Sequence, residues 1–123
     1  MNDLNSVLIE GNLTQDPETR RTQTGTLLCK FSIAANRSYK VHGNEQEEVS
    51  FFPVDVWGDR AEPCVNYLKK GKKVRVLGRL KQERWETSEG AKRERAVIVA
   101  EHVEFGAASR KQMPEIPESA EEA

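Results

Sequence analysis

The chain has little of what marks secreted, metal-binding or membrane proteins. It has two cysteines, Cys29 and Cys64, in 123 residues, and they form no CxxC motif. It has only two histidines, and it contains neither an apolar run of membrane-spanning length nor a signal-peptide core. We therefore expect a reduced cytoplasmic protein with no disulfide, no metal site and no membrane partner.

Signatures of an enzyme are missing as well. The serines and threonines fall in expected turns and strands with no histidine near them in the sequence. Gly58, Gly71 and Gly78 stand singly and form no phosphate-binding loop. We expect no catalytic residues and no cofactor, which leaves a binding protein as the hypothesis.

The charge is nearly balanced overall but unevenly distributed. The formal net charge is −1, and residues 1–106 carry 17 Lys and Arg against 16 Asp and Glu. Between residues 68 and 84 the single acid is Glu83, and the basic residues are Lys69, Lys70, Lys72, Lys73, Arg75, Arg79, Lys81 and Arg84. A local excess of this size can attract a polyanion even when the net charge is near zero.

Period-two alternation predicts an all-β fold with one helix. The expected strands span residues 6–13, 27–36, 49–57, 74–80 and 96–105, and the expected helix spans residues 59–70. The polar segments 39–48 and 86–95 are predicted as loops, with their tips at residues 42–44 and at Gly90. Three strands, a helix and two strands is the order of a five-stranded OB-fold Greek-key barrel.

The composition divides the chain into a domain and a tail. We expect the OB-fold domain at residues 1–106, because apolar content falls sharply after Gly106. Residues 107–123 are poor in apolar side chains and predict a disordered acidic tail. Such a tail is either an inert solubilising segment or a docking segment that competes with a polyanion for the basic residues or binds partner proteins.

Aromatic residues occur beside basic ones in the expected strands and loops. In residues 49–57, alternation puts Val54 and Val56 on the core face and Phe51, Asp55 and Trp57 on the opposite face. An exposed ring can stack on an unpaired base, while a neighbouring Lys or Arg neutralises its phosphate. The alternative is a sandwich in which both faces are buried and these rings belong to the core.

Five stretches resemble the bacterial single-stranded DNA-binding proteins, and together they cover nearly all of residues 4–105. They are SVLIEGNLTQDPE at 6–18, FSIAA at 31–35, VDVWG at 54–58, YLKKG at 67–71, and VRVLGRL at 74–80 followed by Trp85. The resemblance implies an OB-fold homotetramer that binds single-stranded DNA in replication, recombination and repair, in the cytoplasm at the nucleoid. By that resemblance, bases stack on Tyr39, Phe51, Trp57 and Trp85.

Phosphate contacts are expected from basic residues near those rings. The candidates are Lys30, Arg37, Lys73, Arg79, Lys81 and Arg84. An OB-fold adaptor of the primosomal type, which acts through protein contacts and binds DNA weakly, is the alternative function. An OB-fold that binds RNA would use the same stacking chemistry.

The sequence departs from the family pattern at several positions. Pro53 and Glu83 stand where basic residues are common, which predicts fewer phosphate contacts. Lys73 and Arg75 replace neutral residues that pack subunits together, so acids such as Glu104 must offset their charge in a tetramer. The tail lacks the family's terminal Phe, although the family uses that tip to recruit replication and repair proteins.

Overall fold

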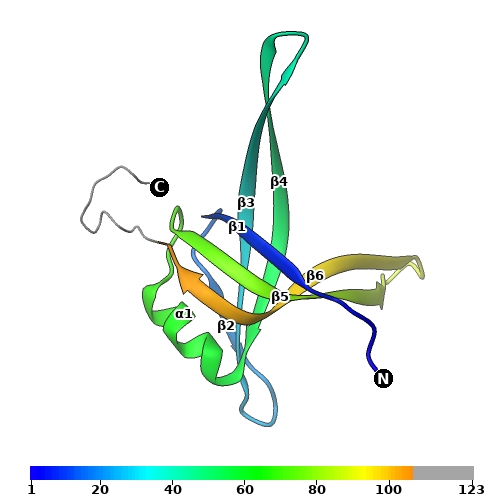
Figure 1. The fold of residues 1–123 in the computed structure, drawn as a ribbon. Coiled ribbons are helices and arrows are strands. Elements are labelled where there is room, and N and C mark those ends of the chain that lie inside the picture. The colour runs from blue at the N-terminus through cyan, green and yellow to red at the C-terminus, as the bar shows by residue number, and fades with distance from the viewer. Residues whose placement is uncertain (107–123) are drawn as a thin grey trace.

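A computed structural model describes residues 1–106, which form a closed β-barrel with two projecting arms (Figure 1). The strands are β1 (Val7–Leu13), β2 (Glu18–Arg21), β3 (Leu27–Val41), β4 (Asn44–Trp57), β5 (Lys73–Glu86) and β6 (Lys92–Phe105). One turn of 3-10 helix, η1 (Gly58–Arg60), leads into helix α1 (Ala61–Tyr67). The predicted tail, residues 107–123, lies outside the described residues.

Five strands close the barrel in the order β1-β5-β6-β4-β3. Closure occurs where β1 returns to β3, with Asn12 opposite Ala34 and Leu13 opposite Ile33. Strands β4 and β6 run parallel at their contact, all other pairs are antiparallel, and β2 adds to the outer edge of β3. The predicted OB-fold barrel is thus confirmed, with its helix between the third and fourth barrel strands.

The core follows from the predicted alternation. Val54 and Val56 of β4 are fully buried, and they meet Val74 and Val76 of β5 in the same cluster. Helix α1 closes one end of the barrel (Figure 1), where its buried Ala61 and Cys64 join Leu68 against the core. Branched side chains with few rotamers suit these pleated, fully buried surfaces.

Two glycines allow the backbone to approach closely where the barrel bends. A Cβ on Gly11 would lie 2.6 Å from the carbonyl oxygen of Ala34, at the point where β1 meets β3. A Cβ on Gly78 would collide with the carbonyl oxygen of Val99. The β5–β6 register shifts between Leu77 and Gly78, so Gly78 lies at a β-bulge.

The two segments predicted as loops are long antiparallel arms, and those two predictions are wrong. Pairing of β3 with β4 continues to Val41 opposite Asn44, and pairing of β5 with β6 continues to Glu86 opposite Lys92. The tips were predicted correctly: His42 and Gly43 both have positive φ, as does Gly90. Both faces of the outer arms are mostly exposed, so their sequences lack the apolar alternation that marks a half-buried strand.

The helix is shorter than predicted. It begins at Ala61 and ends at Tyr67, and its N-cap residue, Arg60, makes no side-chain capping hydrogen bond. The residues after the helix do not continue it but turn toward the end of β1. The Lys70 N–H donates to Asp16 Oδ1, in the β1–β2 connection, at 2.8 Å. The Asn12 side chain likewise donates to the Gly71 carbonyl oxygen at 2.9 Å. These bonds hold the helix-to-β5 connection against the barrel.

Candidate nucleic-acid interface

The outward face of β4 carries two exposed aromatic rings. Phe51 is 63% exposed and Trp57 is 37% exposed, whereas Val54 and Val56 between them point into the core. Their cross-strand neighbours on β3 are Ala34 and Leu28. The alternation therefore places both rings where the sequence predicted them, on the outside of the barrel.

Asp55 lies between these rings in sequence but is buried. Only 3% of it is exposed, and its Oδ1 accepts a hydrogen bond from Lys30 Nζ at 2.9 Å. The pair contributes to a cavity of about 210 Å³, lined also by Ser32 and Pro53, by the β1–β2 connection, and by Arg95 of β6. The predicted phosphate ligand Lys30 is thus occupied by a carboxylate.

Tyr39 and Arg37 lie on the outer part of the β3–β4 arm. Alternation along β3 puts them on the same face as Ile33, opposite to the face that carries Phe51. The Arg37 guanidinium carbon lies 4.9 Å from the centroid of the Tyr39 ring, and Arg37 Nη1 lies 3.2 Å from Glu48 Oε1. One face of the Tyr39 ring is therefore covered by a cation that is itself ion-paired.

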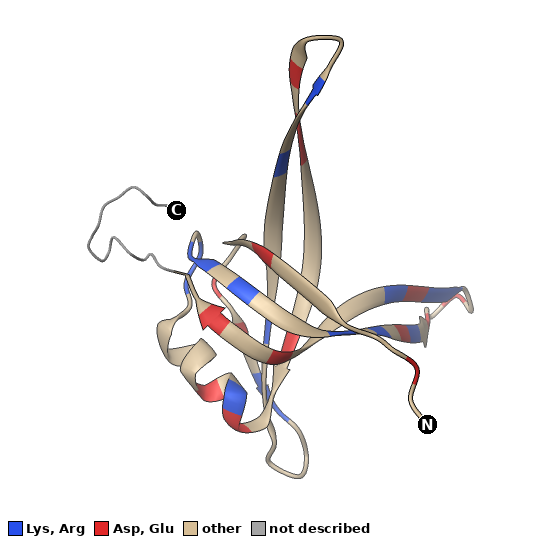
Figure 2. Ribbon diagram, viewed as in Figure 1, with Lys and Arg blue, Asp and Glu red and all other residues tan. Residues whose placement is uncertain are grey.

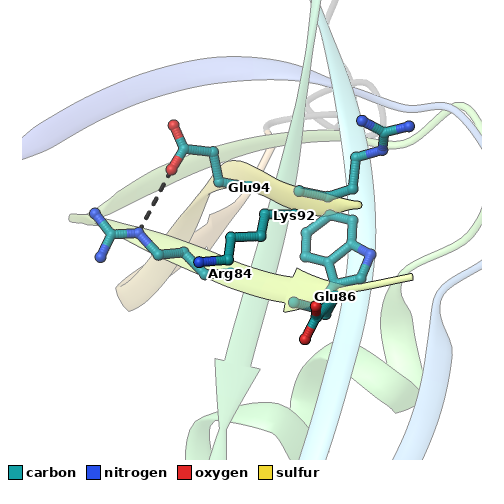
Figure 3. A pocket seen from close by; sticks show the side chains of 6 residues that line it. Arg84, Glu86, Lys92 and Glu94 are labelled. Atoms are coloured by element: carbon teal, nitrogen blue, oxygen red, sulfur yellow. Dashed lines mark ion pairs between the residues drawn. The ribbon is translucent and has the colours of Figure 1, made fainter. Parts of the chain in front are cut away.

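The β5–β6 arm presents Trp85, which is 48% exposed. Its direct cross-strand partner is Arg93. Trp85 helps to line an open cavity of about 670 Å³ at the end of this arm, shown in Figure 3, together with Arg84, Glu86, Lys92, Arg93 and Glu94. An exposed indole next to an open cationic groove suits a base with its phosphate.

Arg84 and Arg93 differ in their neighbours although both lie next to Trp85. Alternation along β5 puts Arg84 on the face opposite to Trp85, and its Nε lies 3.4 Å from Glu94 Oε1 (dashed line in Figure 3). Arg93 lies on the Trp85 face. Arg93 is not among the predicted site residues, because the segment 86–95 was predicted as a loop; extending both strands through that segment would have brought it near Trp85.

The basic cluster of residues 68–84 is not one surface patch. Its first half lies in the helix-to-β5 connection and at the start of β5, and its second half lies on the arm (Figure 2). At about 3.3 Å per residue, Lys73 and Arg84 are separated by roughly 36 Å along the strand. Arg79 and Lys81 lie on the Trp85 side of β5, and within residues 1–106 neither makes an ion pair.

The described residues also bear on metal binding, thiol chemistry and membrane insertion. Within the described residues, no group of three or more His, Cys, Asp and Glu could hold a metal ion. Burial raises the pKa of the Cys29 thiol to about 11 and that of Cys64 to about 12, so both thiols are protonated at neutral pH. None of the helices of residues 1–106 is long and apolar enough to cross a membrane.

The sequence profile of the single-strand binding protein family matches residues 4–106. The chain belongs to this family. The predicted resemblance to bacterial single-stranded DNA-binding proteins is thereby confirmed.

Curated members of the family are similar over most of the chain. The single-stranded DNA-binding protein of Treponema pallidum is 44% identical over 105 residues, which are 85% of this chain and 59% of that protein. Single-stranded DNA-binding protein 3 of Clostridium acetobutylicum is 41% identical over 103 residues, which are 83% of this chain and 70% of that protein. This chain therefore spans less than two thirds of the Treponema relative's length.

Solved structures share the fold. A Plasmodium falciparum SSB in complex with single-stranded DNA superposes with a TM-score of 0.80 at 20% identity, covering 85% of this chain and 97% of that one. A deletion mutant of the single-stranded DNA-binding protein from Thermus aquaticus superposes with a TM-score of 0.74 at 29% identity, covering 83% of this chain and 50% of that one. At 20% identity, the first likeness shows the OB-fold alone.

Proposed function

We propose that this chain binds single-stranded DNA with little sequence preference, by stacking bases on exposed rings and neutralising phosphates with Lys and Arg. The observation that supports this most is the exposure of Phe51, Trp57 and Trp85 on outward surfaces of the barrel and arm. Rings placed there add little to the core and are available to bases. The names of the curated relatives point the same way.

In this proposal aromatic side chains bind the bases, and Lys and Arg side chains bind the phosphates. Stacking contributes about 1–3 kcal/mol per base and tolerates any sequence, because every base has a π-face. Arg79, Lys81 and Lys73 are the proposed phosphate ligands that make no ion pair within residues 1–106. Lys30, Arg37 and Arg84 are also proposed, but each must first exchange a carboxylate for a phosphate. Tyr39 stacks on its uncovered face.

We also propose that the chain assembles as a homotetramer. Leu8 and Leu77 lie opposite each other on the outer face of β1 and β5, and both are exposed. On the same face Arg75 lies 3.3 Å from Glu10 and 3.6 Å from Glu104. Of the two positive charges that the sequence predicted to repel a second subunit, that of Arg75 is therefore neutralised within its own chain, whereas Lys73 makes no ion pair within residues 1–106.

Work in replication, recombination and repair, at the nucleoid, belongs to the same proposal. Residues 1–106 would be the DNA-binding domain, and the acidic segment 107–123, which the structure does not describe, would contact replication and repair proteins. The alternative is an adaptor that acts mainly through protein contacts. The carboxylates paired with Arg37 and Arg84 favour it, because they reduce the positive charge offered to DNA.

A fluorescence titration tests the proposal directly. Oligo-dT should quench the emission of Trp57 and Trp85 at low salt, and rising salt should weaken binding. Trp85→Ala should weaken binding by about 1–3 kcal/mol without loss of the folded barrel, because the ring is exposed.

The matched control is Tyr67→Ala. Tyr67 is also an exposed aromatic, but it lies in α1 and packs on Phe105, 6.1 Å between ring centroids. This variant should bind oligo-dT as the wild type does. Absence of quenching in the wild type at low salt would reject stacking and favour the adaptor.

A further inference from the structure

One acid stands on the Trp85 side of the β5–β6 arm. The cross-strand pairs on that face are Arg79–Val99, Lys81–Val97, Glu83–Arg95 and Trp85–Arg93. Glu83 is the one carboxylate among these eight residues, and it lies between Lys81 and Trp85 along β5. A strand of DNA that stacks on Trp85 and follows the basic residues of β5 must therefore pass this carboxylate.

Glu83 is bound to the cation directly opposite it. Its Oε1 lies 3.2 Å from Arg95 Nε, and the two side chains are 31% and 46% exposed. An ion pair with this exposure is weak, because water and salt screen both charges. A phosphate group offers the same oxygen geometry to a guanidinium as a carboxylate does, so it can take the place of Glu83 on Arg95.

We propose that Glu83 competes with DNA phosphate for Arg95. Because Glu83 is bound to Arg95 in the free protein, it lowers both the affinity and the salt sensitivity of DNA binding at the β5–β6 arm. The inference rests on the proposed function. In the free protein Arg95 already has a carboxylate beside it, which partly offsets its charge, so binding there releases fewer counterions than binding to an unpaired arginine. Glu83 also repels the phosphates that approach Lys81 and Arg93 on either side.

Removal of this carboxylate would turn one face of the arm into a continuous basic surface. Lys81, Arg95 and Arg93 would then follow one another toward Trp85 with no acid among the four cross-strand pairs of that face, although Glu86 and Glu94 still line the cavity beside the ring. The stacking ring itself would be unchanged. The structure thus assigns to one side chain the loss of about one phosphate contact from the salt dependence of the arm.

The test compares oligo-dT binding, measured by tryptophan quenching over a series of salt concentrations, for the full chain and three variants. Glu83→Gln should raise the affinity at the lowest salt by roughly three- to fivefold and steepen the salt slope by about 0.7, the value for one added phosphate contact on a single strand. Glu83→Gln with Arg95→Gln should return the slope to the wild-type value.

Glu62→Gln is the charge-matched control. Glu62 is exposed in the first turn of α1, so its removal changes the net charge equally but leaves both arms intact. It should leave affinity and slope unchanged. An equal gain in Glu62→Gln, or a gain that survives in the double variant, would overturn the inference in favour of general charge effects.

The wild-type titration separates the two proposals. If the wild type is quenched by oligo-dT while Glu83→Gln binds identically, Glu83 is not a competitor and the proposed function stands. If the wild type is not quenched at any salt concentration, the proposed function fails and the inference fails with it. Far-ultraviolet circular dichroism of each variant checks that its β-structure is retained, which is needed because the Glu83 side chain is only 31% exposed.

Discussion

Lys30 Nζ lies 2.9 Å from Asp55 Oδ1, and the two residues are direct cross-strand partners between Phe51 and Trp57. The Asp55 side chain is almost wholly buried, while a fifth of the Lys30 side chain is exposed. A buried carboxylate without a partner is costly, so Lys30 is required for stability before it can be used for binding.

Lys30→Ala should therefore destabilise the protein. We expect the free energy of unfolding to fall by about 2–3 kcal/mol, because Asp55 would remain buried without its cation. Urea denaturation measures this change. Lys40→Ala, on an exposed part of the arm, is the control and should change stability by less than about 0.5 kcal/mol. A Lys30→Ala variant as stable as the control would show that the ion pair is dispensable.

Arg93→Ala and Arg84→Ala remove one positive charge each from the same arm, but from opposite faces. Arg93 lies across from Trp85, whereas Arg84 is paired with Glu94. We expect Arg93→Ala to reduce the salt slope of oligo-dT binding by about 0.7, and Arg84→Ala to reduce it by less. The reverse order would place the DNA on the Arg84 face of the arm.

Gly78→Ala should be among the most damaging single methyl additions to the barrel. The added carbon would collide with the Val99 backbone at the bulge, where no side chain can move aside. We expect a loss of about 2–4 kcal/mol in thermal or urea unfolding. Gly43→Ala at the arm tip has open space but positive φ, so it should cost only about 1 kcal/mol. Equal losses would mean that the bulge adapts.

The buried thiols predict a loss of stability at alkaline pH. Burial raises the pKa of Cys29 to about 11 and of Cys64 to about 12, from 9.0. The folded chain thus retains protons that the unfolded chain releases, so this contribution is complete below pH 9 and is lost as the pH rises toward those values.

Urea midpoints at about pH 8 and about pH 10 measure the effect. Cys64→Ala, which removes one of the two groups, should lose less stability between these values than the wild type loses. If both proteins lose the same amount, the alkaline effect does not come from the Cys64 thiol.

Some elements of the fold were predictable because their residues repeat with the period of a strand. Alternation in β4 separated Val54 and Val56 from Phe51 and Trp57, and the structure buries the first two and exposes the others. The order of these elements was sufficient to predict the OB-fold.

Other elements of the fold could not be predicted from the pattern of residues within any one segment. The arms are strands although their residues are polar, because cross-strand partners such as Arg37 with Glu48 and Arg84 with Glu94 meet only when the hairpins form. Asp55 is buried against its position in the alternation, because Lys30 from a neighbouring strand neutralises it. Neither pairing can be predicted before the register of the paired strands is known.

Apolar periodicity and glycine geometry within each segment were enough to predict the barrel, its core and the exposure of the rings on β4. Which basic residues remain available could be learned only from the folded chain, because that depends on which acid each one faces across a strand pair. Folding divided the basic run of residues 68–84 between two surfaces and brought Arg93 to Trp85. A charge is neutralised by an opposite charge that lies close to it in space, and the linear sequence does not give the distances between side chains.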